Sequence, residues 1–323
     1  MKSRPLGATG LQVSELGFGC GMVGGLMTRG EYPTMRSAVA RALELGISYF
    51  DTATLYGEGQ SEANLGAVLR ELRAEVPIGT KVRLRPTDLD RVGDAIVESV
   101  EGSLRRLGKE RVDLIQLHNP IASRRRTEGA WVGPEELREA LDAFATLSRQ
   151  GKVRFWGVTA IGEIEALHQA VSAGNLHTIQ VPFNLLNPSA GYAVPPDFPH
   201  LDYQRLIDRA AAGRIGSIAI RILAGGALSG TAERHPVATR SVTPIASGQD
   251  YAADVAQAQR LSWLVKEGIV ESLVEAAIRF AISKPELSTA LIGTASLEQF
   301  EQAAAAANRG PLPADVLARL QRV

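Results

Sequence analysis

Short strand-like runs alternate with amphipathic helix-like segments along this chain, and the alternation constrains the fold more than any other feature. A regular alternation of this kind is typical of βα units, whose strands pair in parallel. Eight apolar runs are candidate strands: Leu16–Gly19, Ser48–Asp51, Pro77–Val82, Val112–His118, Phe155–Thr159, Thr178–Val181, Ser217–Ile220 and Thr289–Ile292. Eight such units close into a barrel, so the sequence predicts the α/β class and a (β/α)8 TIM barrel.

The segments between these strands carry helix signals. Apolar residues recur at spacings of three and four residues between Ala95 and Leu107, with charged residues on the opposite face. Four glycines follow such periodic segments, at the position where a left-handed helix cap favours glycine: Gly46, Gly108, Gly151 and Gly174. We therefore expect helices that pack one face on the barrel and end at these glycines.

Several segments lie outside the repeating pattern. Gly7–Val13 predicts a short N-terminal hairpin, and Leu297–Asn308 and Ala314–Arg322 predict additional C-terminal helices. Two long irregular connections, Ser189–Pro199 and Thr231–Gln249, interrupt the later part of the chain. Loops of that length in a compact domain commonly form lids or substrate walls.

Size and composition narrow the class of protein. A barrel of 323 residues commonly folds as one unit, so we expect one domain over residues 1–323. The 35 basic and 35 acidic residues cancel, which leaves no net field to attract nucleic acid or a membrane surface. The only cysteine, Cys20, excludes an internal disulfide framework. Met1–Gly7 lacks the apolar core of a secretory signal, and no run is apolar enough to span a bilayer, so we expect a soluble cytoplasmic protein.

Four polar residues, Asp51, Tyr56, Lys81 and His118, fall at or just past the ends of candidate strands. Barrel enzymes perform their chemistry where the parallel strands end. Reduction of a carbonyl needs an acid at its oxygen, and a free tyrosine has a pKa of about 10, so Tyr56 needs help to share its proton. We expect Lys81 to lower that pKa, Asp51 to keep Lys81 charged, and His118 to orient the carbonyl. The histidines show no metal-ligand spacing, so we expect no metal.

Each of these residues also has an ordinary structural interpretation. Asp51 could cap the next turn, Lys81 could be a surface charge, His118 could be a satisfied strand-end residue, and Tyr56 could be a packed loop aromatic. That all four residues fall at strand ends by accident is a much weaker explanation. A lyase or isomerase that uses Lys81 as a Schiff base is a further alternative.

In order along the chain, the motifs that carry this site resemble those of the aldo-keto reductase superfamily. They are Leu6–Ser14, Gly46–Gly57, Ser61–Glu62, Thr80–Val82, Ser103–Leu107, Leu117–Asn119, Gly151–Arg154 and Gly293–Ser296. The resemblance implies an NAD(P)H-dependent oxidoreductase that interconverts an aldehyde or ketone, which includes sugars, and an alcohol. It implies an extended nicotinamide cofactor across the C-terminal face, with Tyr56 as acid and base and Asp51 near the nicotinamide ribose.

The resemblance also assigns residues to the nicotinamide end of that cofactor. Thr159 and Gln180 take the positions that bind the carboxamide, although Ala160 stands where relatives have asparagine. Many relatives have a tyrosine that stacks on the nicotinamide after the seventh strand. In this chain, Ile220 or Arg221 must form that wall of the nicotinamide site.

Other candidate cofactor residues lie in the loops after the first and eighth strands. They are Gly21, Met22, Gly293, Thr294, Ser296 and Gln299. The loop after the eighth strand lacks the basic residue that relatives use at the adenosine 2′-phosphate. NADPH is the usual cofactor of the family, and for this chain we give NADH almost equal weight as the expected cofactor.

The implied partner is a small carbonyl or alcohol substrate, with Trp131 and Phe183 as candidate walls for it. The substrate, the direction of reaction and the oligomeric state stay open. Some relatives attached to ion channels suggest an alternative, a cofactor-binding regulatory or redox-sensing protein with little turnover.

Overall fold

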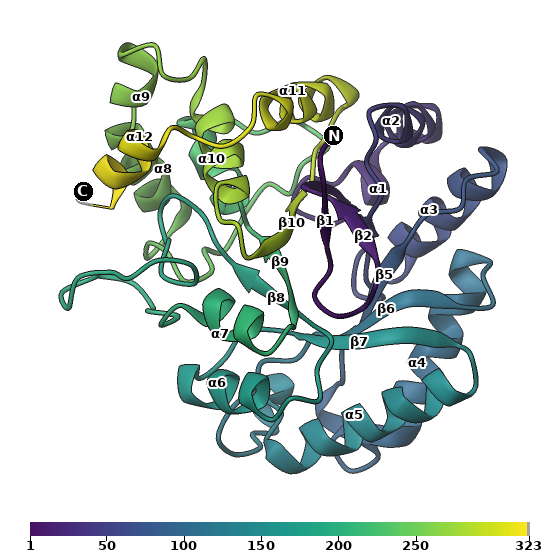
Figure 1. Ribbon diagram of the computed structural model, residues 1–323. Coiled ribbons are helices and arrows are strands. Elements are labelled where there is room, and N and C mark those ends of the chain that lie inside the picture. Colours follow the sequence, from purple (N-terminus) through teal and green to yellow (C-terminus); the bar gives the residue numbers. More distant parts are fainter. Residues whose placement is uncertain (322–323) are drawn as a thin grey trace.

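The computed structural model describes residues 1–321, and eight parallel strands in it close into a barrel (Figure 1). Each strand pairs with the next along the chain, and the last pairs with the first. The strands are β3 (Leu16–Gly19), β4 (Phe50–Asp51), β5 (Ile78–Val82), β6 (Val112–Leu117), β7 (Val153–Thr159), β8 (Thr178–Pro182), β9 (Gly216–Ile220) and β10 (Leu287–Ile292). This confirms the predicted (β/α)8 fold.

All eight strands overlap their predicted positions, and β4 is the shortest because it is two residues long. The predicted strand began at Ser48. Instead, the backbone amide of Ser48 donates to the hydroxyl of Ser14, and the amide of Ser14 donates to the hydroxyl of Ser48. These side-chain bonds replace the ladder at that point, so regular pairing starts at Phe50.

Helices surround the barrel (Figure 1), and their buried apolar residues share one hydrophobic core with residues of the strands. They are α1 (Leu26–Arg29), α2 (Tyr32–Glu44), α3 (Gln60–Glu71), α4 (Val92–Leu107), α5 (Pro134–Arg149), α6 (Ile164–Ser172), α7 (Leu206–Ala212), α8 (Tyr251–Arg260), α9 (Trp263–Lys266), α10 (Leu273–Ile282), α11 (Leu297–Asn308) and α12 (Ala314–Leu320), with the 3-10 turns η1 (Pro86–Asp88), η2 (Glu128–Ala130) and η3 (Ala224–Ser229). The four glycines predicted to end helices have φ between +62° and +81°, as a left-handed cap requires.

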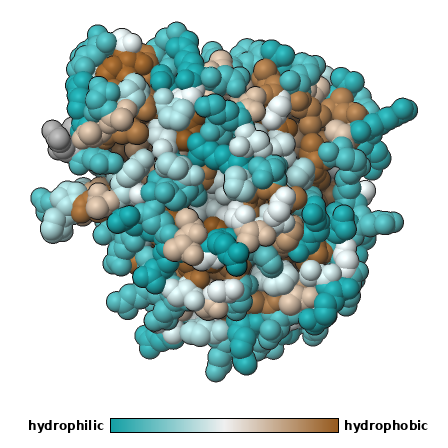
Figure 2. All heavy atoms as spheres, viewed as in Figure 1, coloured by the Kyte–Doolittle hydropathy of each residue, from teal (hydrophilic) through white to brown (hydrophobic). Residues whose placement is uncertain are grey.

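A hairpin closes the N-terminal end of the barrel, in purple in Figure 1. Its strands β1 (Ser3–Pro5) and β2 (Gln12–Ser14) pair antiparallel, and the buried Leu6 and Val13 pack with side chains of the barrel interior. Gly7 makes this closure possible: its φ is +54°, and a Cβ there would lie 2.3 Å from the backbone nitrogen of Gly216. Figure 2 shows the same face covered mainly by hydrophilic residues.

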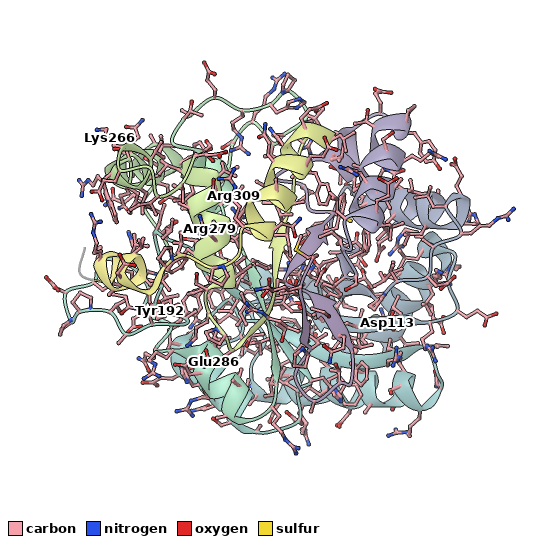
Figure 3. All side chains as sticks on the ribbon, turned by 45° about the horizontal axis from the view of Figure 1, so that its top comes forward. Asp113, Tyr192, Lys266, Arg279, Glu286 and Arg309 are labelled. Atoms are coloured by element: carbon pink, nitrogen blue, oxygen red, sulfur yellow. The ribbon has the colours of Figure 1, made fainter. Side chains whose placement is uncertain are left out.

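The C-terminal helices are held by buried charge. Glu275 on α10 accepts hydrogen bonds from Arg279 of the same helix at 2.9 Å and from Arg309, at the end of α11, at 3.2 Å; Figure 3 labels both arginines. Helix α12 ends at Leu320, and the predicted end at residue 322 lies outside the described residues. Across residues 1–321, no helix has the length and apolar character needed to cross a bilayer.

Residues 231–249, here called the cover segment, form an irregular connection, as predicted. The segment reaches across to the loop after β3. The amide of Thr239 donates to the Val23 carbonyl at 3.0 Å, its hydroxyl donates to the Met22 carbonyl at 2.7 Å, and Arg29 donates to the Val237 carbonyl at 2.9 Å. The cover segment therefore encloses space above the C-terminal ends of the strands.

Candidate active site

The C-terminal ends of three neighbouring strands bring together Asp51, Lys81, Tyr56 and His118. Asp51 ends β4, Lys81 lies in β5, His118 directly follows β6, and Tyr56 lies in the turn after β4. The Lys81 ammonium donates to the Asp51 carboxylate and lies 3.3 Å from the Tyr56 hydroxyl. The rings of Tyr56 and His118 meet edge to face, with centroids 6.0 Å apart.

Lys81 and Asp51 form a buried ion pair, with 1% and 4% of their surfaces exposed. Lys81 also donates to the Thr52 carbonyl at 2.7 Å. Burial alone disfavours the ammonium, but the charges of Asp51 and Tyr56 and the hydrogen bonds to them give a net rise in the pKa of Lys81. The ammonium is therefore charged at neutral pH although it is out of contact with water.

The carboxylate of Asp51 is held through both of its oxygens. Lys81 binds one, while Gln180 from β8 donates to the other at 2.5 Å and Tyr49 donates to it at 3.1 Å. Burial raises the pKa of Asp51, and these three partners act against that rise. Tyr49 was not among the predicted residues. Its position two residues before Asp51 on one strand places both side chains on the same face, and that spacing was the available signal.

Burial raises the pKa of Tyr56, while the charges of Lys81 and Arg221 lower it, and the net change is a rise. This corrects the expectation that Lys81 would bring the pKa down: the ammonium acts in that direction, but loss of water around the phenol outweighs it. Tyr56 is therefore a protonated acid at neutral pH.

Burial, with the charges of Lys81 and Arg83, lowers the pKa of His118 to about 3. Its imidazole is therefore neutral at physiological pH. Its buried Nδ1 atom has no hydrogen-bond partner within residues 1–321. A neutral imidazole donates from one ring nitrogen only, so the ring is suited to hold an oxygen atom without competing as an acid.

A cavity of about 600 Å³ opens above these residues, with Tyr56 and His118 in its wall. Nine of the predicted cofactor residues also line it: Gly21, Met22, Asp51, Gln180, Ile220, Arg221, Gly293, Thr294 and Gln299. Two others do not. Thr159 is fully buried at the end of β7, and the hydroxyl of Ser296 accepts from the Gln299 amide as the cap of α11. The two candidate substrate walls also lie elsewhere: Trp131 packs under Arg126, and Phe183 packs on Phe280 in the core.

Arginine 234 and Tyr251 are further residues of this cavity that the sequence analysis missed. The Arg234 guanidinium donates to the carbonyls of Thr239 at 2.6 Å and Gly225 at 2.9 Å, and it lies over the Tyr251 ring at 5.0 Å. These contacts fasten the cover segment to η3. The segment lacks periodicity, so no sequence pattern pointed to them.

The model of the aldo/keto reductase family matches residues 15–323. The chain belongs to the aldo/keto reductase family. Aldo/keto reductases are oxidoreductases that use nicotinamide cofactors to interconvert carbonyl compounds and alcohols.

Relatives of this aldo/keto reductase include aldo-keto reductase YhdN of Bacillus subtilis, which is 29% identical over 93% of this chain and 87% of its own length. A putative voltage-gated potassium channel subunit beta of Schizosaccharomyces pombe is 32% identical over 58% of this chain and 51% of its own. Among solved structures, the holo form of aldo-keto reductase AKR11C1 from Bacillus halodurans has a TM-score of 0.74 and 25% identity, with coverage of 100% of this chain and 96% of that one.

The cavity of this aldo/keto reductase fits a nicotinamide cofactor. Its volume lies in the range of small-molecule and cofactor sites, roughly 300 to 1,000 Å³. A Cβ at Gly21 would stand 3.8 Å from the Tyr56 ring, so the glycine keeps the space beside the phenol open. His118 lines the same cavity and places a neutral imidazole there.

Proposed function

We propose that this protein is an NAD(P)H-dependent reductase of aldehydes or ketones, or a dehydrogenase of the corresponding alcohols, with Tyr56 as general acid and base. The observation that carries the proposal is the contact between the Tyr56 hydroxyl in the cavity wall and the buried Lys81 ammonium, 3.3 Å apart. A phenol beside a charged amine, both sheltered from water, is suited to exchange a proton with a substrate oxygen.

A bound nicotinamide supplies hydride to the carbonyl carbon or accepts it from the alcohol. The residues of the chain manage the proton. Tyr56 donates it to the carbonyl oxygen as negative charge develops there, and His118 donates a hydrogen bond that orients the same oxygen. Lys81 stabilises the phenolate that remains, and Asp51 keeps Lys81 charged.

We assign the nicotinamide end of the cofactor to Gln180 and Ile220, with Thr159 behind them. The loops after β3 and β10 bind the remainder of the cofactor. The residues that we assign to it are Gly21, Met22, Gly293, Thr294 and Gln299, with Ser296 at the N-terminus of α11. Support comes from the cavity, which runs between these two loops. Ile220 offers an apolar wall in place of an aromatic ring.

The test is turnover of a panel of aldehydes and ketones with each reduced cofactor, followed as loss of dihydropyridine absorbance. Tyr56→Phe is expected to lower kcat by orders of magnitude while cofactor affinity stays within a few-fold. Tyr192→Phe is the matched control, because the structure gives that hydroxyl no hydrogen-bond partner within residues 1–321. Near-normal turnover in Tyr56→Phe would remove Tyr56 from its role.

A second candidate is a regulatory or redox-sensing protein, which the similarity to a channel beta subunit favours. Single-turnover experiments separate the two functions, because a sensor would retain bound reduced cofactor in the presence of every carbonyl tested. A Schiff-base mechanism has less support, since the Lys81 ammonium is paired with Asp51 and its pKa is raised. Borohydride trapping with a carbonyl substrate would detect it.

A further inference from the structure

Arg221 occupies an unusual backbone position at the rim of the active cavity. It directly follows β9 and has a φ of +57°, a left-handed conformation that few side chains adopt. Its carbonyl accepts hydrogen bonds from the Asn184 side chain at 2.9 Å and from the Ala224 amide at 2.7 Å. These two bonds fix the backbone, so the placement of the side chain on the cavity wall is built into the fold.

The guanidinium of Arg221 has little to bind within the described chain. It has no ion pair among residues 1–321, and its one side-chain hydrogen bond is a long one of 3.4 Å to the Thr243 carbonyl. A guanidinium has five N–H donors, so most of its capacity is unused. Arg234, on the same cavity, differs because it donates to two carbonyls at 2.9 Å or less.

The carboxylates around the cavity do not neutralise Arg221. Asp51 is paired with Lys81. Asp254 accepts instead from the Ser247 hydroxyl at 2.8 Å and the Gly248 amide at 2.6 Å. Glu233 lines the cavity but is exposed to water. The charge of Asp254 acts on Arg221, but no carboxylate among residues 1–321 forms an ion pair with its guanidinium, and the residue lines the cavity.

Arg221 is partly buried, and a guanidinium there that lacks a carboxylate partner gains from a ligand that brings the opposite charge. Burial lowers the pKa of Arg221, and Arg221 in turn acts to lower the pKa of Tyr56, so the guanidinium lies within electrostatic reach of the phenol. A planar guanidinium binds carboxylate and phosphate through two parallel hydrogen bonds.

We propose that Arg221 binds a carboxylate or phosphate group in this cavity, and that the enzyme therefore prefers carbonyl substrates that carry such an anion. The inference rests on the proposed reductase function and adds a substrate class to it. A phosphate of the cofactor offers the same chemistry, so the experiment has a separate arm for each source of the anion.

The substrate arm compares 4-oxobutanoate with butanal, two four-carbon aldehydes that differ by a terminal carboxylate. We expect Arg221→Met to reduce the ratio of kcat/KM for 4-oxobutanoate over butanal by roughly tenfold or more, mainly through KM, and Arg221→Lys to restore part of it. Arg240→Met is the control, since Arg240 is exposed on the cover segment and does not line the cavity. It is expected to leave the ratio unchanged.

The cofactor arm measures Kd for NADPH and NADH by fluorescence in the same variants. A loss of cofactor affinity with an unchanged substrate ratio assigns the anion to a cofactor phosphate. A third measurement, calorimetric binding of succinate to the cofactor-loaded protein, needs no turnover, so it tests Arg221 even if no aldehyde is reduced. Equal substrate ratios, cofactor affinities and succinate affinities in wild type and Arg221→Met would overturn the proposal.

Discussion

The hydroxyl of Tyr49 occupies the space in which a side chain at residue 79 would otherwise lie. A Cβ on Gly79 would stand 2.1 Å from the Tyr49 hydroxyl oxygen, which itself lies 3.1 Å from the Asp51 carboxylate. The absence of a side chain at Gly79 therefore allows a third donor to reach Asp51 inside the barrel. Neither Tyr49 nor Gly79 lines the cavity, so both contact the ion pair of Asp51 and Lys81 from the interior of the barrel.

Tyr49→Phe is expected to preserve packing and remove one hydrogen bond to a buried carboxylate. We predict a loss of about 1 to 3 kcal/mol in the free energy of unfolding and a several-fold lower kcat. Urea unfolding and steady-state kinetics measure these two quantities, with Tyr192→Phe as the control. If Tyr49→Phe matched the control in both, the hydroxyl would have no part in supporting Asp51.

Gly79→Ala should create a steric conflict with the Tyr49 hydroxyl and destabilise the protein by about 1 to 3 kcal/mol. Removing the hydroxyl in the double variant Tyr49→Phe/Gly79→Ala is predicted to recover part of that loss. A double-mutant cycle in urea gives the coupling energy. Strict additivity of the two changes would contradict the close contact between them.

The loss of stability at acidic pH should depend on His118. Its pKa is lowered from an ordinary value near 6.5 to about 3, so protonation favours the unfolded chain. Above pH 6.5 this effect costs the folded state no stability. As pH falls toward 3, protonation of His118 in the unfolded chain lowers the free energy of unfolding by roughly 3 to 5 kcal/mol in total. Urea unfolding from pH 7 to 4 should show a shallower slope in His118→Gln than in wild type. If wild type and His118→Gln had the same slope, His118 would not be the group that titrates. His200→Gln is the control variant.

Lys81→Met should change the pH dependence of alcohol oxidation, which needs the Tyr56 phenolate. Without the ammonium, Arg221 is the remaining charge that lowers the pKa of Tyr56, so that pKa rises further and the activity limb moves to higher pH. The measurement is kcat/KM between pH 6 and 11. Lys81→Arg retains the charge and should shift the limb less. If the pH dependence of kcat/KM in Lys81→Met were the same as in wild type, Lys81 would have no influence on the pKa of Tyr56.

The two nicotinamide cofactors should bind with similar affinity. The Gly293–Ser296 loop has no basic side chain, and Glu298 places a carboxylate in the first turn of α11, where its pKa is lowered by hydrogen bonds from its own backbone amide and from Ser296. Negative charge there works against a 2′-phosphate. Fluorescence titration with NADPH and NADH gives both Kd values. A preference of a hundredfold for NADPH would mean that a cation elsewhere holds the phosphate.

The sequence was sufficient for the barrel because strand signals are local. Runs such as Val112–Leu117 carry their own apolar pattern, and glycines such as Gly108 mark the helix ends between them. The four polar residues could be predicted to meet because they follow strands that adjoin in a closed sheet.

The rest of the site depends on contacts between distant segments. The hydrogen bonds from Thr239 to the loop after β3, and the clearance between Tyr49 and Gly79, have no signature in a linear pattern. The same holds for helices α8 and α9, to which we assigned no sequence signal. The net pKa of Tyr56 also required the structure, because burial and a nearby charge oppose each other and only packing sets their balance.

The hairpin at the opposite end of the barrel has a consequence for turnover. With Leu6 and Val13 filling that end, protons and solvent reach the phenol from one direction, through the mouth that admits the ligand. In the proposed mechanism, the proton that Tyr56 gives to the product is therefore replaced through the same mouth by which the product leaves.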